Sequence, residues 1–168
     1  GARRRGPLQE PMKHLVVDAR NALPDNDGLG TYLRQIVPRI CEAGAHTRQF
    51  RTTVLASPAV ESFWHEAAPA AQVVPSTVYP MRPTQNWQIP QLIAPLRPDL
   101  FFYPAHDPPL LLRTPFVFTI HDVTLFKTRP YFERFDRAKH AYLSVVTRAA
   151  LRRARAVFAV SNETRRGI

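Results

Sequence analysis

Short apolar runs alternate along the chain with longer segments in which apolar residues recur at helical spacing. The runs are rich in β-branched and aromatic residues and carry almost no charge, which is typical of buried strands. We expect strands at 15–17, 51–55, 72–74, 100–103, 116–120 and 156–160. We expect helices at 30–44, 58–65, 87–96 and 135–153. This alternation predicts an α/β fold, a doubly wound and Rossmann-like parallel sheet with right-handed crossovers.

Four residues bear on where the helices begin and end. Pro38 lies inside the segment 30–44 and predicts a kink or an early end there. Gly44 is a natural stop for the same helix. Ser57 and Ser161 each precede a helical segment, and serine is a preferred residue at a helix N-cap. The helix after Ser161 would be only about one turn long.

Length and composition favour one soluble, globular domain. The chain has 168 residues, of which 45% are hydrophobic, and this is enough for a single domain with its own core. No stretch approaches the ~20 apolar residues that a membrane-spanning helix needs. We interpret residues 1–11 as a disordered leader, or as sequence added to the native chain, with Met12 as the natural start. The single Cys41 excludes an internal disulfide and favours a reducing compartment such as the cytoplasm.

The formal net charge of +10 points to anionic partners. Nucleic acid, an anionic membrane surface and phosphorylated ligands all satisfy it, as does a solvated helix face followed by a basic tail. Arg148, Arg152, Arg153 and Arg155 lie close together at the end of one predicted helix. We therefore expect peripheral association with the inner face of a membrane.

Candidate chemistry lies after the central apolar run. His121 and Asp122 follow the strand 116–120, and His106 and Asp107 follow the neighbouring strand 100–103. Ligands of an open parallel sheet gather at the carboxyl ends of its strands. A histidine there serves as a base, an anion partner or a structural residue, and the sequence leaves these three open. The chain has no HxH, HExxH or cysteine pair, so we expect no metal.

A glycine pair, Gly28 and Gly30, follows the first strand and opens a helix. Backbone N–H groups at such a helix start suit a diphosphate. The pair lacks the third glycine of a dinucleotide fingerprint, and about ten residues separate it from the strand instead of a tight turn. An ordinary glycine-containing loop is the alternative interpretation.

Six short motifs occur in order along nearly the whole chain from Met12. They are 17–20 (VDAR), 28–33 (GLGTYL), 98–102 (PDLFF), 108–110 (PPL), 119–122 (TIHD) and 159–161 (AVS). Together they resemble the amino-terminal half of GT-B glycosyltransferases, in particular the retaining enzymes of family 4. The resemblance implies one half of a two-domain architecture, in which the active site lies between two doubly wound domains.

The resemblance also implies roles for individual residues. Gly28, Leu29 and Gly30 would contact the diphosphate of the donor through their backbone, and His121 would lie near the transferred sugar. Asp122, His106, Asp107 and Ser161 are acceptor-side candidates. The donor would be a nucleotide sugar, such as a GDP- or UDP-sugar in a mannosyl transfer. The acceptor would be a glycolipid or a polysaccharide, and neither a metal nor another cofactor is expected.

The chain departs from the family pattern in two respects. It lacks the carboxyl-terminal half, which carries most of the nucleotide pocket and the acidic pair of the EX7E motif, and Thr31 stands where a basic residue is common. We therefore expect residues 12–168 to be an acceptor-side domain that is inactive alone. A non-catalytic subunit of a split transferase and a basic nucleic-acid-binding module are the alternatives. Six of the 17 aromatic residues fall within the expected strands, where core packing is the simpler interpretation, and we expect no nucleic-acid partner.

Overall fold

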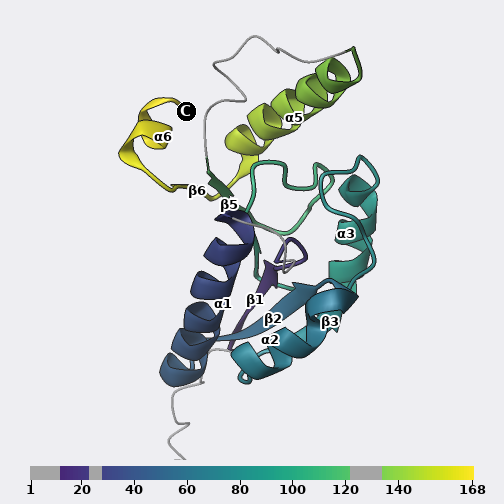
Figure 1. The fold of residues 1–168 in the computed structure, drawn as a ribbon. Coiled ribbons are helices and arrows are strands. Elements are labelled where there is room, and N and C mark those ends of the chain that lie inside the picture. The colour runs from purple at the N-terminus through teal and green to yellow at the C-terminus, as the bar shows by residue number, and fades with distance from the viewer. Residues whose placement is uncertain (1–11, 23–27, 122–133) are drawn as a thin grey trace, which may run out of the picture.

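The computed structural model describes residues 12–22, 28–121 and 134–168. It confirms the α/β fold: six strands pair in parallel throughout, in the order β3-β2-β1-β4-β5-β6 (Figure 1). The strands are β1 (Lys13–Asp18), β2 (Phe50–Ala56), β3 (Gln72–Pro75), β4 (Leu100–Tyr103), β5 (Phe116–Ile120) and β6 (Ala156–Ala159). All six predicted strands are therefore present, with ends within two residues of the expected ones.

Helices connect the strands. The α-helices are α1 (Gly28–Thr47), α2 (Glu61–Ala67), α3 (Gln85–Ile93), α5 (Arg134–Arg153) and α6 (Asn162–Arg166). Two short 3-10 turns, η1 (Pro58–Val60) and η2 (Ala94–Leu96), precede α2 and follow α3. Among the described residues, no helix is both long and apolar enough to cross a membrane.

The sheet separates two hydrophobic cores, because successive side chains of a strand point to opposite faces. Val17 and Phe102 belong to the core under α1 and α2. Their sequence neighbours Val16 and Phe101 belong to the other core, where α3 and the last part of α5 pack. The two cores lie on opposite faces because right-handed crossovers that move outward from β1 in opposite directions place their helices on opposite faces.

Helix α1 is longer than the sequence predicts. It continues through Pro38 and Gly44 to Thr47, so the early end, one of the two outcomes expected at Pro38, is wrong, and so is the expected stop at Gly44. The buried face of the helix explains this, since Leu33, Val37 and Cys41 recur every four residues against the first core. Their burial outweighs the one backbone hydrogen bond that proline removes.

The two serine caps differ. Ser57 lies at the N-cap position before η1, yet its side chain makes no capping hydrogen bond. Ser161 caps α6 as predicted, because its Oγ accepts a hydrogen bond of 3.0 Å from the N–H of Thr164.

Candidate active site

The candidate site lies at the carboxyl edge of the sheet, beside the point where the strand order reverses. Crossovers run outward from β1 toward β3 and from β4 toward β6, which makes the boundary between β1 and β4 the switch point. Ligands of doubly wound sheets bind in the crevice at this point. The first turn of α1 and the residues after β4 and β5 all reach this edge.

His121 follows β5 directly and is half-buried. Its Nε2 lies 2.8 Å from the carbonyl oxygen of Pro104, which follows β4. Its ring meets the ring of Tyr32 edge to face, with 5.0 Å between centroids and an interplanar angle of 88°. Tyr32 belongs to the start of α1, so this contact joins α1 to the end of β5.

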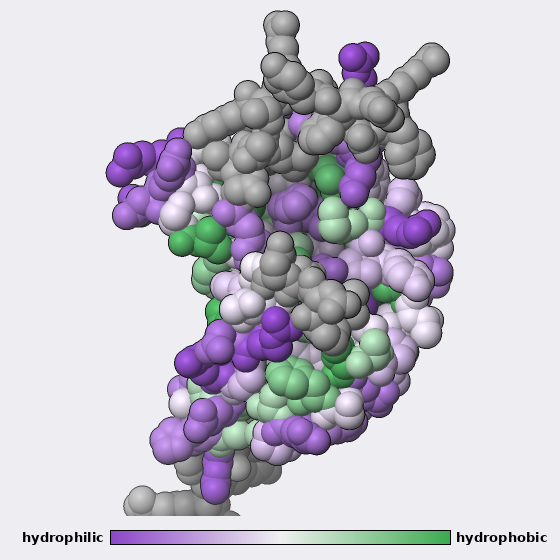
Figure 2. Space-filling model, viewed as in Figure 1, coloured by the Kyte–Doolittle hydropathy of each residue, from purple (hydrophilic) through white to green (hydrophobic). Residues whose placement is uncertain are grey.

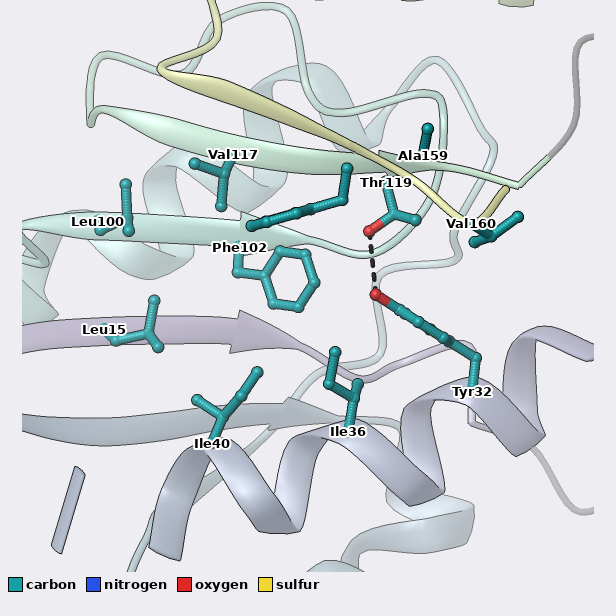
Figure 3. A pocket seen from close by; sticks show the side chains of 11 residues that line it. Leu15, Tyr32, Ile36, Ile40, Leu100, Phe102, Val117, Thr119, Ala159 and Val160 are labelled. Atoms are coloured by element: carbon teal, nitrogen blue, oxygen red, sulfur yellow. Dashed lines mark hydrogen bonds between the residues drawn. The ribbon is translucent and has the colours of Figure 1, made fainter. Parts of the chain in front are cut away.

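Tyr32 is itself held by the sheet. Its hydroxyl lies 3.3 Å from the Oγ1 of Thr119, which is fully buried on β5 (Figure 3). Helix α6 approaches from the other side, where the hydroxyl of Thr164 donates to the backbone carbonyl of His121 at 3.4 Å. The imidazole thus contacts α1 and the residue after β4, while α6 holds the backbone of His121.

The predicted diphosphate-binding residues form the first turn of α1. Gly28 is exposed, Leu29 is half-buried and Gly30 is buried. Two residues further along the helix, Tyr32 touches His121, so the glycine segment and the histidine lie at one edge of the sheet. The positive end of the helix dipole points to the same edge.

A network of buried polar side chains lies at the carboxyl end of β1 and extends to the loop after β4. Arg20 is 1% exposed, and its guanidinium donates to both carboxylate oxygens of Asp18, to the carbonyl of Val78 and to Oε1 of Gln85. Burial opposes the charge of Arg20, but Asp18 outweighs it and the pKa of the guanidinium is raised. The two charges are therefore buried at the end of β1 as a hydrogen-bonded ion pair.

Asp107 belongs to the same network and is fully buried. Its carboxylate accepts hydrogen bonds from the hydroxyl of Tyr103 at 3.1 Å and from Nε2 of Gln85 at 2.9 Å. Burial raises the pKa of the Asp107 carboxyl to about 6, and burial also raises the pKa of Tyr103. The Asp107 carboxylate thus fixes the loop after β4, which carries the Pro104 carbonyl.

The remaining acceptor-side candidates fall in different places. His106 is half-buried, and its backbone carbonyl accepts a hydrogen bond of 2.7 Å from Thr147 on α5. Ser161 is exposed at the start of α6, and its Oγ bonds to Thr164, whose hydroxyl reaches the backbone carbonyl of His121. Asp122 lies outside the described residues. Within the described ranges, no three His, Cys, Asp or Glu side chains gather closely enough to hold a metal ion.

An apolar groove of about 510 Å³ runs between α1 and the same face of β4, β5 and β6 (Figure 3). Tyr32, Ile36 and Ile40 project into it from one side of α1, and Phe102 and Val117 line the sheet side. Phe158 of β6 also lines the groove. Phe158 and Val160 are each 49% exposed. Figure 2 shows a hydrophobic patch directly below the hydrophilic surface residues at the place of α6.

A model of a known family matches most of the chain. The model is described as Glycosyltransferase Family 4, and it covers residues 26–168. The chain belongs to this glycosyltransferase family. A search of the curated proteins finds no match.

In this family 4 glycosyltransferase, sequence reasoning located His121 and the glycine segment but gave no role to their neighbours. Tyr32 was detectable, because its spacing with Ile36 and Ile40 places all three on one face of a helix. Arg20 also had a signal, since it is a charge just beyond a strand end. The sequence carries no signal for the Pro104 carbonyl, because every residue type has a backbone carbonyl.

Proposed function

We propose that this glycosyltransferase chain is the acceptor-side domain of a retaining enzyme. It would transfer a sugar from a nucleotide-sugar donor, such as a GDP- or UDP-sugar, to a glycolipid or polysaccharide acceptor. A donor-binding domain beyond these residues completes the cleft in this proposal. The observation that carries it is the contact of His121 with Tyr32, which joins the carboxyl end of β5 to the start of α1.

The chemistry assigns a task to each side of this contact. During transfer, the bond between the anomeric carbon and the diphosphate oxygen breaks, the oxygen of the acceptor hydroxyl bonds to that carbon, and the hydroxyl proton passes to the departing diphosphate. Negative charge grows on the departing diphosphate. The start of α1 stabilises that charge through its dipole and backbone N–H groups, while His121 lies near the sugar.

The test uses the full-length gene product that contains this chain. We expect it to bind UDP- or GDP-sugars and to transfer the sugar, and we expect His121→Ala to reduce transfer by about 100-fold or more. The variant His65→Ala is the matched control, since His65 is an exposed residue of α2 that lies 3.7 Å from Glu61. Absence of nucleotide-sugar binding by the full-length protein would contradict the proposal.

The same proposal includes attachment to an anionic membrane surface through the end of α5. Arg152, Arg153 and Arg155 are all exposed, but Arg153 also donates to the carbonyls of Leu110 and Leu112 and so holds a loop. A basic residue near an anionic surface contributes about 1 kcal/mol.

Sedimentation with anionic vesicles tests this attachment. We expect the double variant Arg152→Ser/Arg155→Ser to lose about thirty-fold in vesicle affinity at low salt. Arg39→Ser, on the exposed side of α1, serves as the control and should change little. An equal loss of binding free energy per removed charge in the two variants would show that net charge, not this helix end, drives binding.

A further inference from the structure

The hydrogen bond to Pro104 determines which nitrogen of His121 carries its proton. A neutral imidazole has one N–H donor and one bare acceptor nitrogen, and the partner of each nitrogen decides which is which. The partner of Nε2 is a backbone carbonyl at 2.8 Å, and a carbonyl only accepts. Nε2 must therefore be the protonated nitrogen, and Nδ1 holds the lone pair.

The plane of the ring is fixed by a second contact. Tyr32 meets the imidazole at 88°, and the Tyr32 hydroxyl is tied to the buried Thr119. The backbone of His121 is also held, because its carbonyl accepts from Thr164. Among the residues whose side chains the structure describes, Nδ1 meets no hydrogen-bond partner.

We propose that the Pro104 carbonyl and the Tyr32 ring lock His121 in the Nε2–H tautomer and present Nδ1 as a hydrogen-bond acceptor for a substrate hydroxyl group. Tyr32 is then a positioning residue, which acts on the substrate only through His121. The tautomer stands on the geometry alone, whereas the hydroxyl partner rests on the proposed transferase function.

This assignment limits what His121 can recognise. A bare nitrogen accepts a hydrogen bond from a hydroxyl group but offers none to an ionised phosphate oxygen, which is also an acceptor. The neutral ring therefore selects the sugar or the acceptor hydroxyl, and the diphosphate is left to the start of α1.

A second histidine provides an internal control at the other end of the sheet. His14 is 3% exposed on β1, with Nδ1 at 2.9 Å from the carbonyl of Leu96 and Nε2 at 2.8 Å from Oγ1 of Thr53. Burial lowers the pKa of His14, so its ring stays neutral near pH 7. The same reasoning predicts the opposite tautomer, with the proton on Nδ1 and an acceptor at Nε2.

The first experiment is a long-range ¹H–¹⁵N correlation spectrum of the ¹⁵N-labelled chain above pH 7, with His121→Ala and His14→Ala used for assignment. We expect a protonated Nε2 and a bare Nδ1 for His121, and the reverse for His14. A His121 spectrum with the proton on Nδ1, or with an even mixture, would overturn the proposal whether or not the protein transfers sugar.

Two variants separate positioning by Tyr32 from simple stabilisation. Tyr32→Phe keeps the ring contact and should leave the His121 signals on the Nε2–H pattern. Tyr32→Leu removes the ring and should shift them toward a mixture, while the His14 signals confirm that the fold is intact. Unchanged His121 signals in Tyr32→Leu would refute the positioning role.

Kinetics of the full-length enzyme identify the working atom. An asparagine places its amide oxygen near the position of Nδ1, whereas the amide of a glutamine reaches the position of Nε2. We expect His121→Asn to retain about tenfold more kcat/KM than His121→Gln, which corresponds to one hydrogen bond. The reverse order in an active enzyme would overturn the role of Nδ1, and an inactive wild-type protein would instead contradict the proposed function.

Discussion

The buried charges at the end of β1 are the residues on which the candidate site rests most directly. Asp18 and Arg20 are almost inaccessible, and the short contact between their side chains measures 2.6 Å. Removing both charges together is often tolerated in proteins, but removing one leaves the other buried without a counter-ion. Loss of the Arg20 side chain would also remove its hydrogen bonds to the carbonyl of Val78 and to Oε1 of Gln85.

The first prediction concerns this pair. We expect Arg20→Met to lower the free energy of unfolding by about 3–5 kcal/mol, because the Asp18 carboxylate is then buried without its counter-ion. The double variant Asp18→Asn/Arg20→Met should cost less than the sum of the two single variants. Urea unfolding measures all three, and additive costs would contradict the coupling.

The second prediction concerns pH. Burial raises the pKa of Asp107 to about 6, whereas an unfolded aspartate titrates near about 3.9. The folded protein thus holds this proton more tightly, so the stabilisation is complete below about pH 4 and is lost as pH rises through about 6. The loss amounts to about 3 kcal/mol at most.

Thermal unfolding of Asp107→Asn against the wild type between pH 4 and 7 measures this contribution. The variant should lack the decline in stability toward pH 6. Asp99→Asn provides a contrast of opposite sign, because the hydrogen bond from the N–H of His14 lowers the pKa of Asp99 and its stabilisation is lost as pH falls. Parallel pH profiles of wild type and Asp107→Asn would contradict the assignment.

At the level of whole elements, the sequence predicted the strands well and the limits of α1 poorly. A strand such as β5 is buried at every position, so its apolar run is continuous and visible. Gly44 instead looks like a helix end but lies within α1, packed against Phe50. A glycine required for close packing and a glycine required for a C-cap are identical in sequence.

The same limit applied to the candidate site. His121 could be placed because it follows a recognisable strand, and the glycine segment because it precedes a helix. Their partners depend on contacts between residues far apart in the chain, such as Tyr32 with His121 and Pro104 with His121. Only the assembled sheet brings these groups together.

The third prediction uses the two glycines of α1. A Cβ at position 44 would lie 2.7 Å from a ring carbon of Phe50 and 2.8 Å from its backbone oxygen, so Gly44→Ala should cost about 1–3 kcal/mol. A Cβ at Gly28 meets no atom within 4 Å, so Gly28→Ala should stay within about 0.5 kcal/mol of the wild type. Chemical denaturation compares the pair, and equal effects would contradict the packing role.

For the molecule as a whole, the helices cover the sheet unevenly. Those of the β1–β3 half lie on one face and those of the β4–β6 half on the other, as right-handed crossovers require. The α1 side of β4–β6 therefore stays open along the apolar groove within the described part of the chain. This arrangement follows from the topology and not from any single side chain.

The fourth prediction tests that open face. We expect the chain to enhance the fluorescence of the apolar dye ANS, which binds exposed hydrophobic surface. Phe158→Ser should weaken the signal, since Phe158 is 49% exposed in the groove. Phe63→Ser, at an exposed position of α2, is the control. Equal losses from both variants would show that the dye does not report on the groove.

The contact between Thr164 and His121 has a mechanical consequence. The Thr164 hydroxyl reaches the carbonyl of the very residue that carries the imidazole. A force that displaced α6 would pass to that residue through one bond, with no other side chain between them. A change in the position of this short helix would therefore alter the setting of the histidine without any contact to its ring.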